Sequence, residues 1–182
     1  ESKVVFVSDS IVFVVSPNGS QQQIPVTGLR FMARPSLSLN GNRIVVQASI
    51  FPDAPPRDLN IYVIDLQTRQ YQRIGTSPDN EESPECFPLS NKIAYPSFSP
   101  QTGIDLHIYD LAAQSEVLLI PGAGGLHLAI SPDESKILEP GRMRIYSAMT
   151  GAQLSDLDST VTTALNNAGY NVDTRYPSRV PP

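Results

Sequence analysis

The sequence predicts an all-β fold, a β-propeller of about four blades with four strands each. One pattern recurs three times: a short strand, a polar turn, a basic residue and a second apolar strand. The basic residues are Arg43, Lys92 and Lys136, which lie 49 and 44 positions apart. A period of about 40–50 residues built from short strands is typical of propeller blades. The 17 prolines and 11 glycines among 182 residues also suit a fold rich in loops.

A second pattern, an apolar hairpin, follows each basic strand. The polar residues at the corners of these hairpins are Ser16, Asp65, Asp110 and Ser147. Apolar and β-branched runs on both sides of a polar turn indicate antiparallel hairpins. Each repeat therefore has strands A, B, C and D, and we expect blades at about 1–28, 29–76, 77–121 and 122–154. Lys3 occupies the position of the basic residue in the first repeat, so the first blade lacks its own strand A.

The repeats resemble the β-propeller repeat of TolB-type periplasmic proteins, which are WD40-like. The resemblance is carried by residues 35–46 (PSLSLNGNRIVV), residues 58–66 (DLNIYVIDL) and the turn Ser131-Pro132-Asp133. It covers residues 3 to about 154 and implies a propeller fold, protein–protein interaction and a periplasmic or otherwise extracytoplasmic location. Two departures are the absence of tryptophan and a repeat number below six blades.

The end of the chain offers a candidate for the missing strand. Pro35 and Pro84 each stand eight positions before a basic residue, and Pro177 would stand eight before Lys3 if the two ends were joined. The predicted closing strand contains Tyr176, Pro177, Ser178 and Val180. It either closes the first blade of its own chain, as a closed or partial propeller, or adds to a neighbouring chain. A chance match of two short motifs is the third reading.

Residues 155–182 are expected to belong to the same domain as a short helix followed by this extended tail. The helix is predicted near 159–168. Asp158 or Ser159 would cap its start, and Gly169 would end it.

Motifs for catalysis, cofactors and metals are absent from the sequence. It has neither a Gly-x-Ser-x-Gly elbow nor a Gly-x-x-x-x-Gly-Lys phosphate loop. His107 and His127 have no partner at metal-ligand spacing, so we expect structural roles, although His127 could face the central channel. Cys86 is expected to be a small buried hydrophobe. We therefore predict no catalytic, cofactor or metal residues and no enzyme.

Charge narrows the choice of partner. The net charge is −5, and the 13 basic residues are spread along the chain, which argues against nucleic acid. The acidic group formed by Asp79, Glu81, Glu82 and Glu85 is expected in a solvated loop between blades, with a cation or partner site as the alternative. The longest apolar run, 11–15, is too short to cross a membrane.

Two predicted loops carry large apolar residues beside arginine, a combination enriched in interface hot spots. The first is the D–A loop over 29–34, and the second is the B–C loop over 50–58. The predicted partner-binding residues are Arg30, Phe31, Met32, Arg34, Phe51, Arg57 and Asp58. In the alternative reading, Phe31 anchors strand A under the core and Phe51 folds back on its own blade.

The sequence leaves three functional hypotheses. The first is a non-catalytic scaffold or protein-interaction subunit of an extracytoplasmic or membrane-associated complex. The second is a propeller enzyme or carbohydrate-binding protein with a site in the central channel, for which two or more carboxylates there would be the discriminating feature. The third is a structural subunit that assembles into homo-oligomers through its C-terminal strand.

Overall fold

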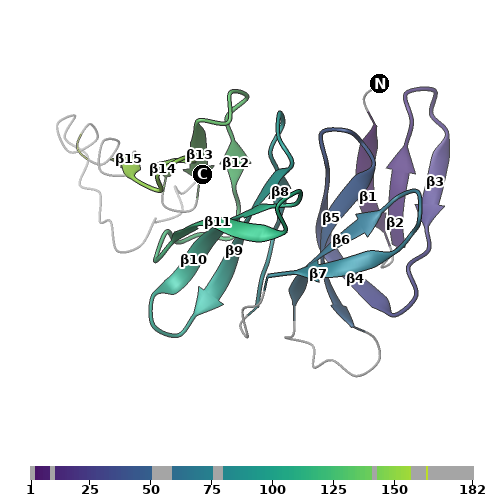
Figure 1. Cartoon of the computed structure of the whole chain (residues 1–182), viewed down its shortest axis with the longest axis horizontal. Coiled ribbons are helices and arrows are strands. Elements are labelled where there is room, and N and C mark those ends of the chain that lie inside the picture. The colour runs from purple at the N-terminus through teal and green to yellow at the C-terminus, as the bar shows by residue number, and fades with distance from the viewer. Residues whose placement is uncertain are drawn as a thin grey trace, which may run out of the picture.

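The structure is a computed structural model that describes residues 3–8, 11–50, 59–75, 80–140, 143–156 and 163, with Phe31 and Met32 described in their backbone only. Across these residues the chain forms four antiparallel sheets that follow one another in sequence order (Figure 1). The first sheet contains β1 (Val4–Ser8), β2 (Ile11–Val15) and β3 (Gln21–Ile24). The second contains β4 (Leu29–Leu37), β5 (Arg43–Ile50), β6 (Asn60–Asp65) and β7 (Tyr71–Ile74). The third contains β8 (Glu85–Cys86), β9 (Lys92–Ser99), β10 (Gly103–Asp110) and β11 (Ser115–Ile120). The fourth contains β12 (Ala129–Ile130), β13 (Lys136–Glu139), β14 (Arg144–Ser147) and β15 (Gln153–Asp156). We call these sheets blades 1 to 4.

The hairpin corners of blades 2 and 3 are stabilised by aspartate side chains, which accept hydrogen bonds from backbone N–H groups of the turn. The Asp65 carboxylate accepts hydrogen bonds from the backbone N–H groups of Gln67 and Thr68, both at 2.9 Å. The Asp110 carboxylate likewise accepts hydrogen bonds from the backbone N–H groups of Ala112 and Ala113. The backbone hydrogen bond from Thr68 holds the pKa of Asp65 below its ordinary value, against the opposing effect of burial. This is the behaviour of an Asx turn, which tightens a hairpin connection.

The blades stack face to face, and the hydrophobic core lies between neighbouring blades. Val14 of blade 1 and Tyr62 of blade 2 belong to one buried cluster, and Ile61 of blade 2 and Tyr95 of blade 3 belong to a second. A third cluster, which includes Tyr146, joins blades 3 and 4. Each blade therefore buries its faces only by having neighbours, as expected for repeat folds.

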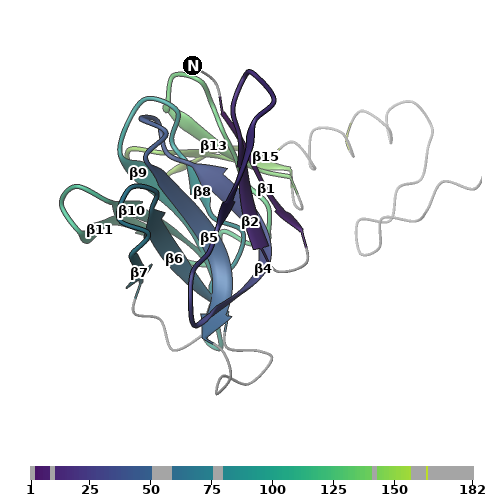
Figure 2. The ribbon, with the colours of Figure 1, turned by 90° about the vertical axis from the view of Figure 1, so that its right-hand side faces the viewer.

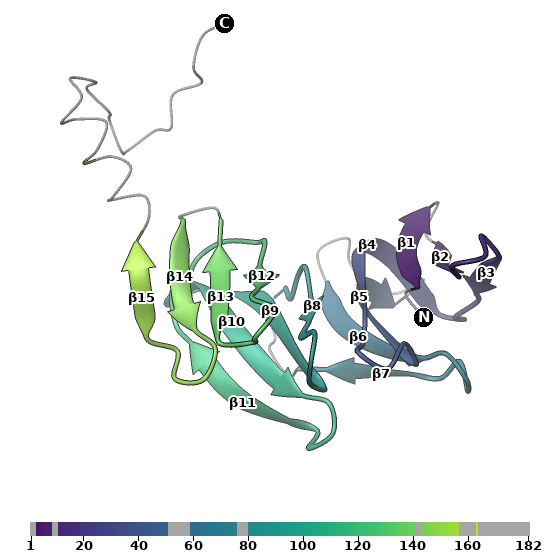
Figure 3. The same ribbon diagram turned by 90° about the horizontal axis from the view of Figure 1, so that it is seen from above.

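The first strand of each complete blade lies on the inside of an arc. Figure 3 shows β4, β8 and β12 toward the concave side, with β7, β11 and β15 outside, and with blades 1 and 4 at the two ends of the arc. In each complete blade the four strands pair in chain order. The inner strands are thus strands A, and β1, the first strand of blade 1, corresponds to strand B.

The structure confirms the propeller prediction, and among the described residues blade 1 contains three strands. It corrects the predicted loop over 29–34, because Leu29 and Arg30 already pair with Ile50 and Ser49 as part of β4. The long strand β5 extends far enough to pair with this segment, so the chain enters the sheet earlier than its polar residues suggest. The predicted helix near 159–168 and the closing tail lie outside the described residues, apart from residue 163. No helix among the described residues is long and apolar enough to cross a membrane.

Candidate functional site

A β-bulge in the innermost strand of blade 2 sets the position of Arg34. Ala33 pairs with Gln47 and Ser36 pairs with Val45, so Arg34 and Pro35 lie together against one residue of β5. Arg34 has a φ of 56°, in the left-handed region. A non-glycine residue held there costs about 1–3 kcal/mol, and bulges redirect side chains near functional sites.

The same local structure occurs in blade 3. Ser83, which also precedes a proline, has a φ of 44°. Its backbone N–H donates to the Gln47 side-chain oxygen of blade 2 at 3.1 Å. A left-handed residue before proline is therefore a repeated feature of the inner strands, and Arg34 is the member of this set with a charge.

Arg34 reaches across the inside of the arc to blade 4. Its Nη2 lies 3.0 Å from Nε2 of His127, a residue 93 positions away that precedes β12. Arginine has only donors, so Nε2 of His127 accepts this hydrogen bond, and the ring proton resides on Nδ1 in the neutral form. His127 thus faces the inside of the propeller, as the sequence analysis allowed.

Two carboxyl groups of blade 3 border this pair. Glu82 and Glu85 are half-buried. Burial raises the pKa of Glu82 above its ordinary value, opposed by the positive charge of Arg34 and by His127. Burial also raises the pKa of Glu85, again opposed by Arg34. We call Arg34, Glu82, Glu85 and His127 the inner cluster, and it draws on three blades.

The inner cluster corrects the expectation of a solvated acidic loop. Glu81 is fully buried, and its Oε2 accepts from the backbone N–H of Ile61 at 3.2 Å. Glu85 belongs to strand β8, and Asp79 lies outside the described residues. The chain folds this segment inward because Glu81 pairs with Ser97 of β9 across an isolated bridge.

The predicted partner-binding loops are described only in part. Arg30 and Arg34 are exposed on β4. The side chains of Phe31 and Met32 lie outside the described part of the chain, as do Phe51, Arg57 and Asp58. Sequence reasoning selected Arg34 for partner binding and considered His127, Glu82 and Glu85 separately, but it did not place them beside Arg34. The signal available was the recurrence of a polar residue directly before a strand-A proline, as at Arg34 and Ser83.

A Ser–His–Glu chain crosses three strands of blade 3. Ser97 Oγ lies 2.7 Å from His107 Nε2, and His107 Nδ1 contacts the Glu116 carboxylate. This order resembles a nucleophile, a base and an orienting acid. However, Ser97 is only 3% exposed, and the His107 ring stacks on Tyr95 with centroids 5.0 Å apart. These hydrogen-bonded side chains therefore link neighbouring strands of blade 3, in agreement with the packed role expected of His107.

Cys86 packs against the core cluster between blades 2 and 3, as the sequence predicts, but it is half-buried and not fully buried. Burial raises the pKa of its thiol to about 12. Its backbone N–H donates to Ser36 Oγ at 3.0 Å, which links the inner strands of blades 2 and 3. A thiol with this pKa carries almost no thiolate near neutral pH and is a poor nucleophile.

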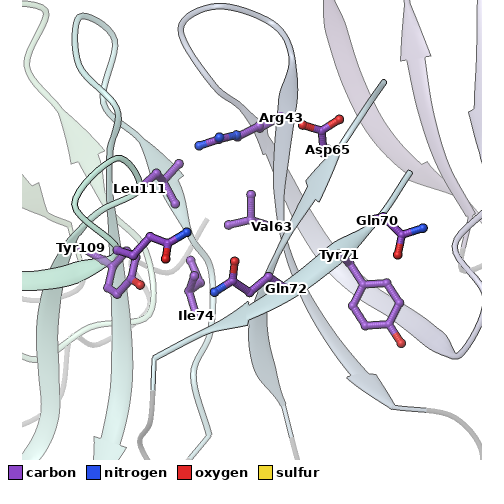
Figure 4. A pocket seen from close by; sticks show the side chains of 10 residues that line it. Arg43, Val63, Asp65, Gln70, Tyr71, Gln72, Ile74, Tyr109 and Leu111 are labelled. Atoms are coloured by element: carbon purple, nitrogen blue, oxygen red, sulfur yellow. The ribbon is translucent and has the colours of Figure 1, made fainter. Parts of the chain in front are cut away.

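A groove lies between blades 2 and 3 and includes none of the inner-cluster residues (Figure 4). Its cavity of about 310 Å³ is lined by Val63, Ile74 and Leu111 at the bottom and by Arg43 and Gln72 beside them. Asp65, at one end, already serves its own hairpin corner. The groove is thus an incompletely filled seam between two blades.

Comparison with known proteins supports the fold. No protein-family model and no curated protein matches the sequence. Among solved structures, TolB from Acinetobacter baumannii superposes with a TM-score of 0.61 at 23% identity, over 83% of this chain and 39% of TolB. The Dos1 propeller superposes at 0.58 and 12% identity, over 84% of this chain and 43% of that one. A chain of the Mitotic Checkpoint Complex superposes with a TM-score of 0.56 at 14% identity, over 85% of this chain and 46% of that one.

These likenesses establish a TolB-like, WD40-like β-propeller fold. The chain spans about two fifths to just under half of each of these structures. A shared fold at such low identity does not carry over a site, because propellers host many functions.

Proposed function

We propose that the chain is a non-catalytic protein-interaction module, a scaffold subunit of an extracytoplasmic or membrane-associated complex. The partner would engage the concave side of the arc at the inner cluster. The observation that carries the proposal is the inner cluster itself, in which an exposed arginine and a histidine lie beside two half-buried carboxyl groups. The location rests on the resemblance to TolB-type periplasmic proteins.

The energetics of the cluster favour a binding role. Burial opposes the charged forms of Glu82 and Glu85, and Arg34 offsets this only in part. The backbone of Arg34 is held in the left-handed region. Features that reduce stability and gather in one place are typical of sites kept for function. A partner segment with one acidic and one basic side chain would pair its acidic group with Arg34 and its basic group with Glu82 and Glu85. Such complementary pairing gives specificity for a polar peptide.

The test begins with isolating partners of the full chain from an envelope fraction and purifying the best candidate. Its affinity is then measured by calorimetry for the wild type, Arg34→Ala and Glu85→Gln. Lys136→Ala is the control, because Lys136 is an exposed basic residue on β13. We expect each cluster variant to weaken binding about tenfold or more, and the control to bind normally. Unchanged affinity in both folded cluster variants would refute the site.

The two carboxyl groups support one competing function, a channel site for a carbohydrate. Paired carboxyl groups, one with a raised pKa, are the arrangement that glycoside hydrolysis uses. Glu82 and Glu85 both have raised pKa values through burial. Screening the wild type and the Glu82→Gln/Glu85→Gln double variant against neutral oligosaccharides distinguishes the two. Binding or hydrolysis by the wild type alone would favour the sugar site.

A further inference from the structure

The seams between the blades are filled in different ways. In the seam between blades 3 and 4, Gly151 lies against two side chains of β11, the outermost strand of blade 3. A Cβ added to Gly151 would lie 3.0 Å from Ile120 Cγ1 and 3.5 Å from Leu118 Cδ1. Both side chains also take part in the buried packing that joins these two blades. Direct apolar contact therefore closes this seam at its outermost strand (Figure 2 shows the same blades from the side of blade 1).

Gln72 of blade 2 occupies the position that Leu118 has in blade 3. Each pairs with the residue two positions before its hairpin corner, Val63 in blade 2 and Ile108 in blade 3. Gln72 is exposed and lines the groove between blades 2 and 3. In Figure 4 its side chain points toward blade 3. This seam therefore has an amide where the next seam has a leucine.

Gln114 of blade 3 occupies the position that Gly151 has in blade 4, four residues after the hairpin corner. The φ angle is 53° at Gln114 and 72° at Gly151. Glycine adopts this left-handed backbone at little cost, whereas a residue with a side chain is unfavourable there. Arg69 of blade 2 has the same backbone, with a φ of 59°, and lines a cavity together with residues of blade 1. A side chain at this corner position therefore accompanies a seam that is not filled.

Two adjoining cavities make up the groove between blades 2 and 3. The first, of about 310 Å³, has an apolar floor of Val63, Ile74 and Leu111. The second, of about 660 Å³, extends to the exposed Glu116. The residues that line both cavities are Gln72, Ile74, Tyr109 and Gln114. Both volumes lie within the range of about 300–1,000 Å³ that is typical of ligand sites.

The charges along the groove are balanced. Each cavity is lined by one arginine and one carboxylate, Arg43 with Asp65 in the first and Arg73 with Glu116 in the second. Asp65 already serves its own hairpin corner, and Glu116 contacts His107. Electrostatic complementarity therefore favours an uncharged ligand.

We propose that this groove binds an extended, uncharged peptide segment through one aliphatic side chain. That side chain fills the first cavity above Val63, Ile74 and Leu111, where the burial of apolar surface is favourable. A primary amide both donates and accepts hydrogen bonds, so Gln72 and Gln114 match the C=O and N–H groups of a peptide backbone. A neutral saccharide offers hydroxyl groups to the amides but no aliphatic group to the floor. The groove shares no residue with the inner cluster, so this site goes beyond the proposed function.

The test gives the groove the residues of the closed seam. The full chain is screened against a random library of acetylated and amidated hexapeptides, and the retained peptides are synthesised. Calorimetry then measures their affinity for the wild type, for Gln72→Leu/Gln114→Gly and for Gln153→Leu. Gln153 is the control because it is also an exposed glutamine on an outermost strand, β15. The single variant Gln72→Leu replaces the double variant if the latter fails to fold.

We expect the retained peptides to share an aliphatic residue. The double variant should bind them at least about ten times more weakly than the wild type and the control do. Replacing the shared aliphatic residue by alanine should weaken binding to the wild type by a similar factor. Arg34→Ala should bind the same peptides normally, which separates this groove from the inner cluster.

Three results would overturn the proposal. The first is equal affinity of the peptides for the wild type and the double variant, and the second is a screen that retains no peptide. The third is binding of neutral oligosaccharides by the wild type but not by the double variant, which would make the groove a sugar site.

Discussion

Replacing Gly75 by alanine tests how blades 2 and 3 are joined. Gly75 follows β7 with a φ of +83° and lies against the buried Glu81 carboxylate. An added Cβ would lie 2.2 Å from Glu81 Oε1 and 2.8 Å from the Tyr95 hydroxyl. Both atoms would have to move, although Glu81 also bonds the backbone of Ile61.

Two costs contribute to the effect. A left-handed backbone at a non-glycine residue costs about 1–2 kcal/mol. Moving the Glu81 carboxylate off its buried donor costs roughly another 1–3 kcal/mol. We therefore expect Gly75→Ala to lower the free energy of unfolding by about 2–5 kcal/mol, or the Tm by roughly 10 °C for a chain of this size.

Gly19→Ala is the matched control. Gly19 has a φ of +80°, but nothing lies within 4 Å of its added Cβ. It should show the backbone cost alone, about 1–2 kcal/mol. Urea unfolding followed by circular dichroism measures both variants. Equal losses in the two variants would refute the proposed collision with Glu81.

Three further predictions concern single groups. Burial raises the pKa of Glu82 and Glu85, so the folded state favours their protonated forms. The stability that this gives below their unfolded pKa near 4.5 is lost as the pH rises through the folded pKa. Glu82→Gln should therefore raise the Tm at pH 7 and have no such effect at pH 4, and a lower Tm at pH 7 would contradict this. The Cys86 thiol has a pKa of about 12. It should react with iodoacetamide at pH 8 on the order of a thousand times more slowly than the same thiol in the urea-unfolded chain. Similar reaction rates in the two states would show that the thiol is not desolvated. Tyr146→Phe removes the buried hydroxyl that donates to the Ala123 carbonyl at 2.9 Å. It should lower the free energy of unfolding, measured in urea, by about 1–3 kcal/mol. An unchanged free energy of unfolding would mean that this carbonyl finds another donor.

The strand order of the propeller could be predicted because its determinants are local. The basic residue at the start of strand B and the serine or aspartate at each hairpin corner recur at similar places in the repeats, and the corner side chains act on neighbours only a few positions away. The match of β1 to strand B of the other blades followed from the same phase.

The inner cluster could not be predicted in full, because it depends on contacts between distant parts of the chain. Arg34 and His127 are 93 positions apart, and their contact follows from the curvature of three stacked blades. Glu81 was misjudged for a similar reason, since its buried partners lie on blade 2. The predicted loop over 29–34 was wrong because the length of β5 decides where pairing begins.

The exchange of backbone amides in β1 tests most directly the sequence prediction that the C-terminal strand pairs with blade 1. Hydrogen–deuterium exchange of residues 4–8 is compared between the full chain and a chain ending at Gly169, with β9 as the internal reference. If residues 176–180 pair with β1, its amides are protected in the full chain and exchange faster after truncation, while β9 exchanges at the same rate in both. Identical exchange of β1 in the two chains would contradict closure by the tail.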